Sequence, residues 1–183
     1  MTGSIAGIVR AIEALNDAVG RTVSWLAVVL VFTTCLVAVL RYGFSIGFVW
    51  MQELYVWMHA AVFLLVSGYT LQHEGHVRID VFYGPASLRT KAWINIFGTL
   101  VFLFPMLALI AYVGTPYVLL SWTRLEASQE AGGLHGLFLL KSCMLGFVVL
   151  LALQGVALLL RSAMVIAGNP EWDPSNRKPA DGH

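Results

Sequence analysis

Residues 50–80 have the sequence WMQELYVWMHAAVFLLVSGYTLQHEGHVRID. One carboxylate, Glu53, lies near the start of this stretch, and a charged turn begins near its end at His73. Residues 54–71, between them, contain no Asp, Glu, Lys or Arg. A helix rises about 1.5 Å per residue, so roughly 20 apolar residues cross a hydrocarbon core about 30 Å thick. The stretch therefore predicts a transmembrane helix.

The rest of the chain has the same character. It is 58% hydrophobic and 11% charged, whereas soluble domains average about 25% charged residues. Backbone polar groups are satisfied in lipid only by helices and closed barrels, and continuous apolar runs lack the alternation of barrel strands. We therefore expect an all-α membrane protein whose transmembrane domain covers residues 22–167. Its four transmembrane helices are predicted over residues 22–41, 50–72, 92–122 and 137–166.

The two ends are predicted to lie outside this bundle. Residues 1–21 show apolar side chains at spacings of three and four with charged ones between them, which predicts an N-terminal amphipathic helix lying in the membrane interface. The alternative is a plain extension of the first span. Residues 168–183 begin with Gly-Asn-Pro, which ends the fourth span, and continue as a polar, mobile tail.

The third span is longer than a bilayer requires. Residues 92–122 would extend about 46 Å as one straight helix, so the span must tilt, bend or project beyond the lipid. Pro105 and Pro116 are the expected bending points.

Basic residues predict the orientation. Four spans would place eight Lys and Arg residues on the side of the termini and three on the other side. The positive-inside rule then puts both termini in the cytoplasm. The three on the opposite side are Arg41, Arg124 and Lys141.

Two polar groups within the second span are candidates for chemistry. Glu53 has two interpretations, an ion ligand or proton relay and an interfacial residue that reaches a donor nearby. His59 lies near the middle of the bilayer, where a single buried histidine is more often a hydrogen-bonded packing residue than a ligand. A haem between helices needs a second histidine at matching depth, and none is evident.

Elsewhere the residues do not form a recognisable catalytic, cofactor or metal site. Arg78 and Asp80 can pair with each other or with a neighbouring subunit. Cys35 and Cys143 fall within spans, where cysteine is mostly an apolar filler, and we expect no disulfide. A net charge of +1 gives no reason to expect nucleic-acid binding. The residues alone therefore indicate an accessory membrane subunit rather than an enzyme.

Three motifs carry a resemblance to a known family. In order and spacing they resemble the small, DctQ-like permease subunit of tripartite ATP-independent periplasmic (TRAP) transporters, over residues 20–165. The motifs are Trp50-x-x-Glu53, the loop Gly75-His76-Val77-Arg78-Ile79-Asp80-Val81, and Glu126-x-Ser128 followed by Gly132-Gly133-Leu134, Lys141 and Gln154-Gly155. His135 departs from the pattern, because proline often follows Gly-Gly-Leu in the most similar branch.

The resemblance implies a role in a three-part importer of the bacterial inner membrane. A periplasmic substrate-binding protein (P-type) captures an organic anion, typically a carboxylate, and a large multi-span permease subunit (M-type) carries it inward with sodium. The small subunit packs against the large subunit's scaffold and lipids, helps to dock the binding protein, and itself holds neither sodium nor a cofactor. The residues implied at interfaces or in structure are Trp50, Glu53, Arg78, Asp80, Glu126, Ser128, Gly132, Gly133 and Lys141.

Two alternatives belong to other functional classes. One is the membrane anchor of a respiratory enzyme that binds quinone or haem. The other is a small carrier that works by itself.

Overall fold

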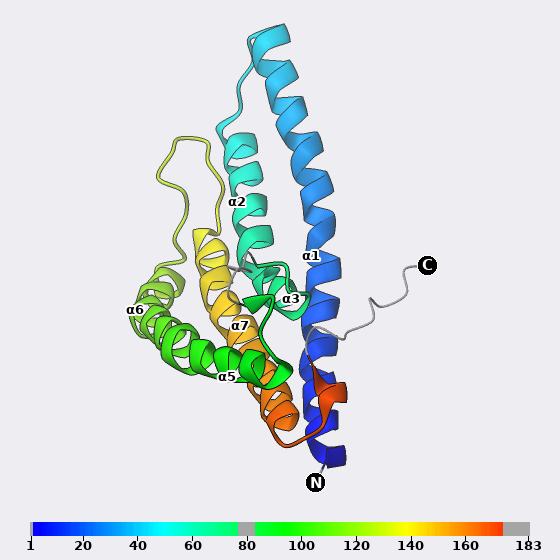
Figure 1. Cartoon of the computed structure of the whole chain (residues 1–183). Coiled ribbons are helices and arrows are strands. Elements are labelled where there is room, and N and C mark those ends of the chain that lie inside the picture. The colour runs from blue at the N-terminus through cyan, green and yellow to red at the C-terminus, as the bar shows by residue number, and fades with distance from the viewer. Residues whose placement is uncertain (1, 77–82, 174–183) are drawn as a thin grey trace.

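The computed structural model describes residues 2–76 and 83–173. Four helices in this part are long and apolar enough to span a membrane, which confirms the all-α, four-span prediction. Their bounds are Ser4–Phe44, Val49–Gln72, Leu88–Thr123 and Leu137–Ile166. Figure 1 shows them as a bundle in which α1 runs the full height of the molecule.

The first span and the predicted interfacial helix form one element, α1 (Thr2–Phe44). The helix continues through residue 21 without a break, which is the alternative that the sequence left open. Its 43 residues correspond to about 65 Å, about twice the thickness of a hydrocarbon core. Its N-terminal half packs through Val9, Asn16 and Gly20, which are buried. Part of the polar face therefore turns toward the protein rather than toward water.

The second span consists of α2 (Val49–Leu65) and α3 (Ser67–Gln72), joined at Val66. The Ser67 hydroxyl donates a hydrogen bond to the Leu64 carbonyl, 2.8 Å away. The backbone N–H of Val66 still bonds to the Val62 carbonyl at 3.1 Å. The two helices therefore form one nearly continuous span.

The third span consists of α5 (Leu88–Gly98), the π-helix η1 (Thr99–Leu103) and α6 (Phe104–Thr123). It starts before the predicted residue 92 because the Ser87 hydroxyl caps the helix by accepting a bond from the Thr90 N–H, at 3.2 Å. Pro105 has no N–H to donate to a carbonyl one turn earlier, and the wider π-turn lies immediately before it. Figure 1 shows α5 and α6 as one curved ribbon lying across α7. The α-helix is interrupted by the π-turn just before Pro105, whereas α6 continues through the other predicted bending point, Pro116.

The fourth span, α7 (Leu137–Ile166), is the centre of the bundle and packs against α1, α2, α3, α5 and α6. Close packing is clearest at Gly155, where a Cβ would lie 2.9 Å from a Leu103 methyl and 3.1 Å from the Phe104 ring. After Gly168, η2 (Pro170–Trp172) folds back on α7, and Asp173 is buried. The beginning of the predicted mobile tail is therefore packed, and residues 174–183 lie outside the described part.

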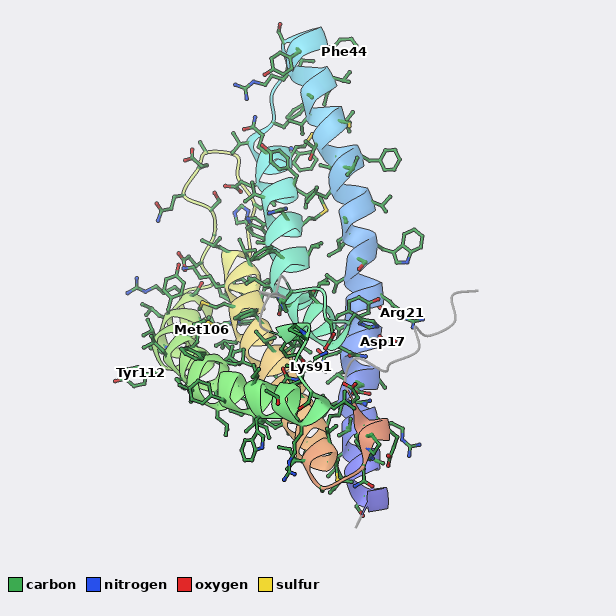
Figure 2. The ribbon with its side chains drawn as sticks, in the orientation of Figure 1. Asp17, Arg21, Phe44, Lys91, Met106 and Tyr112 are labelled. Carbon is green, nitrogen blue, oxygen red and sulfur yellow. The ribbon has the colours of Figure 1, made fainter. Side chains whose placement is uncertain are left out.

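Large apolar side chains cover much of the surface. The most hydrophobic window of α1 has no buried residue, and Trp25 and Phe32 on this helix are 72% and 71% exposed. Figure 2 shows Tyr112 projecting from α6 away from the bundle. Such a surface is suited to lipid or to other apolar helices.

Candidate functional site

Glu53 connects the second span to the loop of residues 124–136. Its carboxylate accepts a hydrogen bond from the Ser128 hydroxyl. The other carboxylate oxygen accepts one from the backbone N–H of Leu134, at 2.6 Å. Ser128 and Leu134 lie on opposite arms of the loop, so one side chain from α2 holds both arms. This geometry agrees with the interpretation in which Glu53 reaches a nearby donor.

The 124–136 loop is folded as a short hairpin. Ala127 and His135 form an isolated antiparallel bridge. The Ser128 N–H donates to the Leu134 carbonyl and the Leu137 N–H donates to the Glu126 carbonyl, both at 2.9 Å. These bonds flank His135, so a proline at this position would cost neither of them. The departure of His135 from the family pattern is therefore compatible with the hairpin.

Gly132 and Gly133 have different structural roles in the hairpin. Gly132 has a φ of +80°, a conformation that favours glycine. Gly133 lies against the Glu53 contact: a Cβ there would approach the Ser128 hydroxyl to 2.5 Å and a Glu53 carboxylate oxygen to 2.7 Å. The absence of a side chain at Gly133 therefore allows Glu53 to reach the loop.

A second attachment of the loop lies at the start of α7. Lys141 forms a salt bridge with Glu126, and its ammonium group lies 4.0 Å from the centre of the Tyr117 ring. The hydrogen bond from Lys141 holds the pKa of the Glu126 carboxyl below its ordinary value. The sequence analysis identified Glu126 and Lys141 but missed Tyr117. The contact of its ring with Lys141 depends on the packing of α6 against α7 and cannot be read from the sequence.

The other predicted site residues do not join this cluster. Trp50 is 43% exposed, and its ring lies 6.2 Å from that of Phe48. Arg78 and Asp80 lie outside the described residues. Both Cys35 and Cys143 are free thiols.

The sequence left the role of His59 open, and the structure shows that this residue is not packed between the helices of this chain. Its side chain is exposed, and its ring stacks on that of Phe63 with 6.4 Å between centroids. Depth along a span can be read from the sequence, whereas the side on which a helical residue projects is set by the packing of the whole bundle.

A polar contact that sequence reasoning missed joins α1 to α7. We call Glu13, Asn16, Gln154 and Arg161 the α1–α7 polar seam. Arg161 donates to both carboxylate oxygens of Glu13, at 2.7 and 2.9 Å, and the Asn16 amide donates to Gln154 at 3.1 Å. The Trp172 ring lies 6.0 Å from the Arg161 guanidinium. The sequence signal was a charge and an amide on the same side of each helix, one turn apart on α1 and two turns apart on α7.

Polar side chains near the ends of the spans hold the helices and the 124–136 loop together. Glu53, Lys141 and Arg161 each lie within about two turns of an end of the span that carries them. Each has a partner of opposite charge or a hydrogen-bond donor. In residues 2–76 and 83–173 no group of three His, Cys, Asp or Glu side chains is placed to hold a metal ion.

Comparison with known proteins identifies the family. A search of curated proteins and a search of solved structures find no match. A family described as "Tripartite ATP-independent periplasmic transporters, DctQ component" matches residues 30–164, which covers all four predicted spans in whole or in large part. This range contains Glu53, the 124–136 loop and Lys141. The chain therefore belongs to the DctQ family, the small membrane component of TRAP transporters.

Proposed function

We propose that this chain is the stationary part of the membrane complex, on which the large permease subunit moves its cargo. The observation that carries the proposal is the double attachment of the 124–136 loop, through Glu53 to α2 and through Lys141 to α7. A loop that is held at both ends presents a fixed shape, which lowers the cost of ordering it when a partner binds. One part of the exposed apolar surface of the spans supplies the contact with the large subunit.

The proposed complex imports an organic anion, most simply a carboxylate, with sodium. Both are handled by the large permease subunit and the periplasmic binding protein rather than by this chain. The chain lies in the inner membrane with both termini in the cytoplasm, so the 124–136 loop faces the periplasm and contributes to docking of the binding protein. The arrangement of basic residues supports this orientation.

The first experiment asks whether the chain needs its partners. The chain would be purified alone and together with a large permease subunit of the M type, and each preparation would be reconstituted in vesicles with the binding protein and a sodium gradient. We expect stable co-purification and sodium-dependent uptake from the pair, and no flux from the chain alone. Flux through the chain alone would contradict the proposal and favour a self-contained carrier.

An absorption spectrum of the same preparation tests the remaining alternative. A respiratory anchor that binds haem would show a Soret band, and we expect none. A band that survives purification of the complex would contradict the transporter role proposed for this chain.

A further inference from the structure

His59 occupies an unusual place on the second span. It lies ten residues after Val49, the first residue of α2, which corresponds to about 15 Å of helix and so to about half the thickness of a hydrocarbon core. Its side chain is nevertheless exposed. On the same side of the helix Val56 and Phe63 are 53% and 75% exposed, at helical spacings of three and four. We call these three residues the His59 face of α2.

The imidazole has no hydrogen-bond partner among the described residues. Its ring stacks on the ring of Phe63. A neutral imidazole carries one donor and one acceptor, and an unpaired polar group in an apolar medium is unfavourable. Long lysine and arginine side chains escape this cost by reaching to the interface, but a histidine ring at mid-span is too short to do so.

An apolar groove continues from the same face. It has a volume of about 690 Å³ and is lined by α2, α3, η1, α6 and α7. Phe63 belongs both to its lining and to the His59 face, while Leu103, Met106 and Phe147 form its far walls. A bulky apolar side chain fits such a groove, and it would enter about one helical turn from the histidine.

The unpaired imidazole and the adjacent apolar groove together indicate what kind of partner fits this face. Lipid acyl chains can fill an apolar groove, but they offer no hydrogen bond to an imidazole at mid-depth. A transmembrane helix offers both, through a polar side chain and an apolar one on the same face. Helices in lipid associate through close packing and interhelical hydrogen bonds, since hydrophobic expulsion gives no advantage there.

We propose that the His59 face of α2 is the contact surface for one transmembrane helix of the large permease subunit. That helix places a hydrogen-bonding side chain against His59 and a bulky apolar side chain in the groove beside Phe63. The inference rests on the proposed function, because that function supplies the identity of the partner, but the location of the contact comes from this chain alone.

The test combines substitution with cross-linking. His59→Leu removes the hydrogen bond, His59→Gln keeps a donor and an acceptor, and Phe32→Leu is the matched control on the exposed apolar part of α1. Interhelical hydrogen bonds in membranes are modest, so we expect His59→Leu to weaken association with the large subunit about three- to tenfold. His59→Gln and Phe32→Leu should remain close to wild type. The thermal stability of the isolated chain should change little in His59→Leu, because the imidazole makes no hydrogen bond within the described part of the chain and leucine can still pack on Phe63.

A photoreactive benzoylphenylalanine at position 59 gives the second readout. We expect an adduct with the large subunit, located by mass spectrometry to a transmembrane helix. An adduct with lipid or with a second copy of this chain, or wild-type association in His59→Leu, would overturn the inference while the wild-type complex still formed. Failure of the wild-type chain to co-purify with the large subunit would instead overturn the proposed function, and this inference with it.

Discussion

The carboxylate of Glu53 is shared between two arms of one loop, so its contribution depends on geometry as well as charge. One oxygen accepts a hydrogen bond from the Ser128 hydroxyl and the other accepts one from the Leu134 N–H. An amide at this position can accept only through its single carbonyl oxygen. Glu53 therefore acts as a double acceptor that no uncharged side chain of the same size reproduces.

Substitution of Glu53 should loosen the 124–136 loop without unfolding the bundle. In Glu53→Ala the Leu134 N–H loses its partner, and we expect amides of the loop to exchange with deuterium several-fold faster. Glu53→Gln should be intermediate, because one hydrogen bond can be kept. The measurement is hydrogen exchange by mass spectrometry, with Glu130→Gln as the control because Glu130 is an exposed carboxylate in the same loop. Equal protection of the loop amides from exchange in wild type and Glu53→Ala would show that Glu53 does not hold the loop.

The salt bridge between Glu126 and Lys141 makes the same loop sensitive to acid. The pKa of Glu126 is lowered in the folded chain, chiefly by the hydrogen bond from Lys141. The folded state therefore binds this proton less readily than the unfolded state does. The stabilisation is complete above the ordinary glutamate pKa of about 4.3 and is lost as the pH falls through the lower, folded value.

We accordingly expect exchange in the 124–136 loop, corrected for the intrinsic pH dependence of exchange, to be constant from neutral pH to about pH 5 and to rise below about 4.3. Glu126→Gln should abolish this component of the pH dependence and leave the loop loosened at neutral pH. A wild-type profile retained in Glu126→Gln would assign the acid sensitivity to another group.

At the scale of elements, the N-terminal half of α1 shows what a periodic sequence pattern can predict and what it cannot. The spacing of apolar and charged residues correctly predicted a helix, but it suggested that the whole charged face meets water. The structure turns Glu13 and Asn16 toward α7, where they meet Arg161 and Gln154. These partners are 148 and 138 residues away in the chain. A pattern within one helix contains no information about a partner at such a distance.

The α1–α7 polar seam should therefore stabilise the packing of these two helices. A double-mutant cycle with Glu13→Gln and Arg161→Gln should give a coupling of about 0.5–3 kcal/mol, the range for contacting residues. Arg21→Gln is the control, since Arg21 is 62% exposed and pairs with Asp17 within the same helix, and such pairs contribute only about 0.3–0.5 kcal/mol. Denaturant unfolding in detergent micelles would measure all of these variants. Additive effects of the two seam substitutions would show that the ion pair contributes nothing to helix packing.

At the scale of the whole molecule, the number of spans was predictable because it depends on apolar length. The starts of the first and third spans were not, because α1 continues the first span to the N-terminus and the Ser87 cap begins the third span at Leu88. An irregularity of the helix near Pro105 followed from the missing N–H of proline, although its form as a π-helix did not. The Glu53, Ser128 and Gly133 set was recognised by resemblance, but the hydrogen bonds that unite it cross 75 and 81 residues. The exposure of His59 could not be predicted for a related reason, since it depends on how α2 is rotated within the bundle.

The orientation of the four spans decides which partner the 124–136 loop can meet. Eight basic residues on the side of the termini and three on the other predict that this loop is periplasmic. In a background with Cys35→Ala and Cys143→Ala, single cysteines would be introduced at Gln129 in the loop and at Ala167 after α7, both of which are exposed. A maleimide that cannot cross membranes should label Gln129→Cys in intact spheroplasts, and Ala167→Cys only after lysis. The reverse pattern would place the Glu53-anchored loop in the cytoplasm, where it cannot dock a periplasmic protein, and would leave the scaffold role to rest on the transmembrane faces alone.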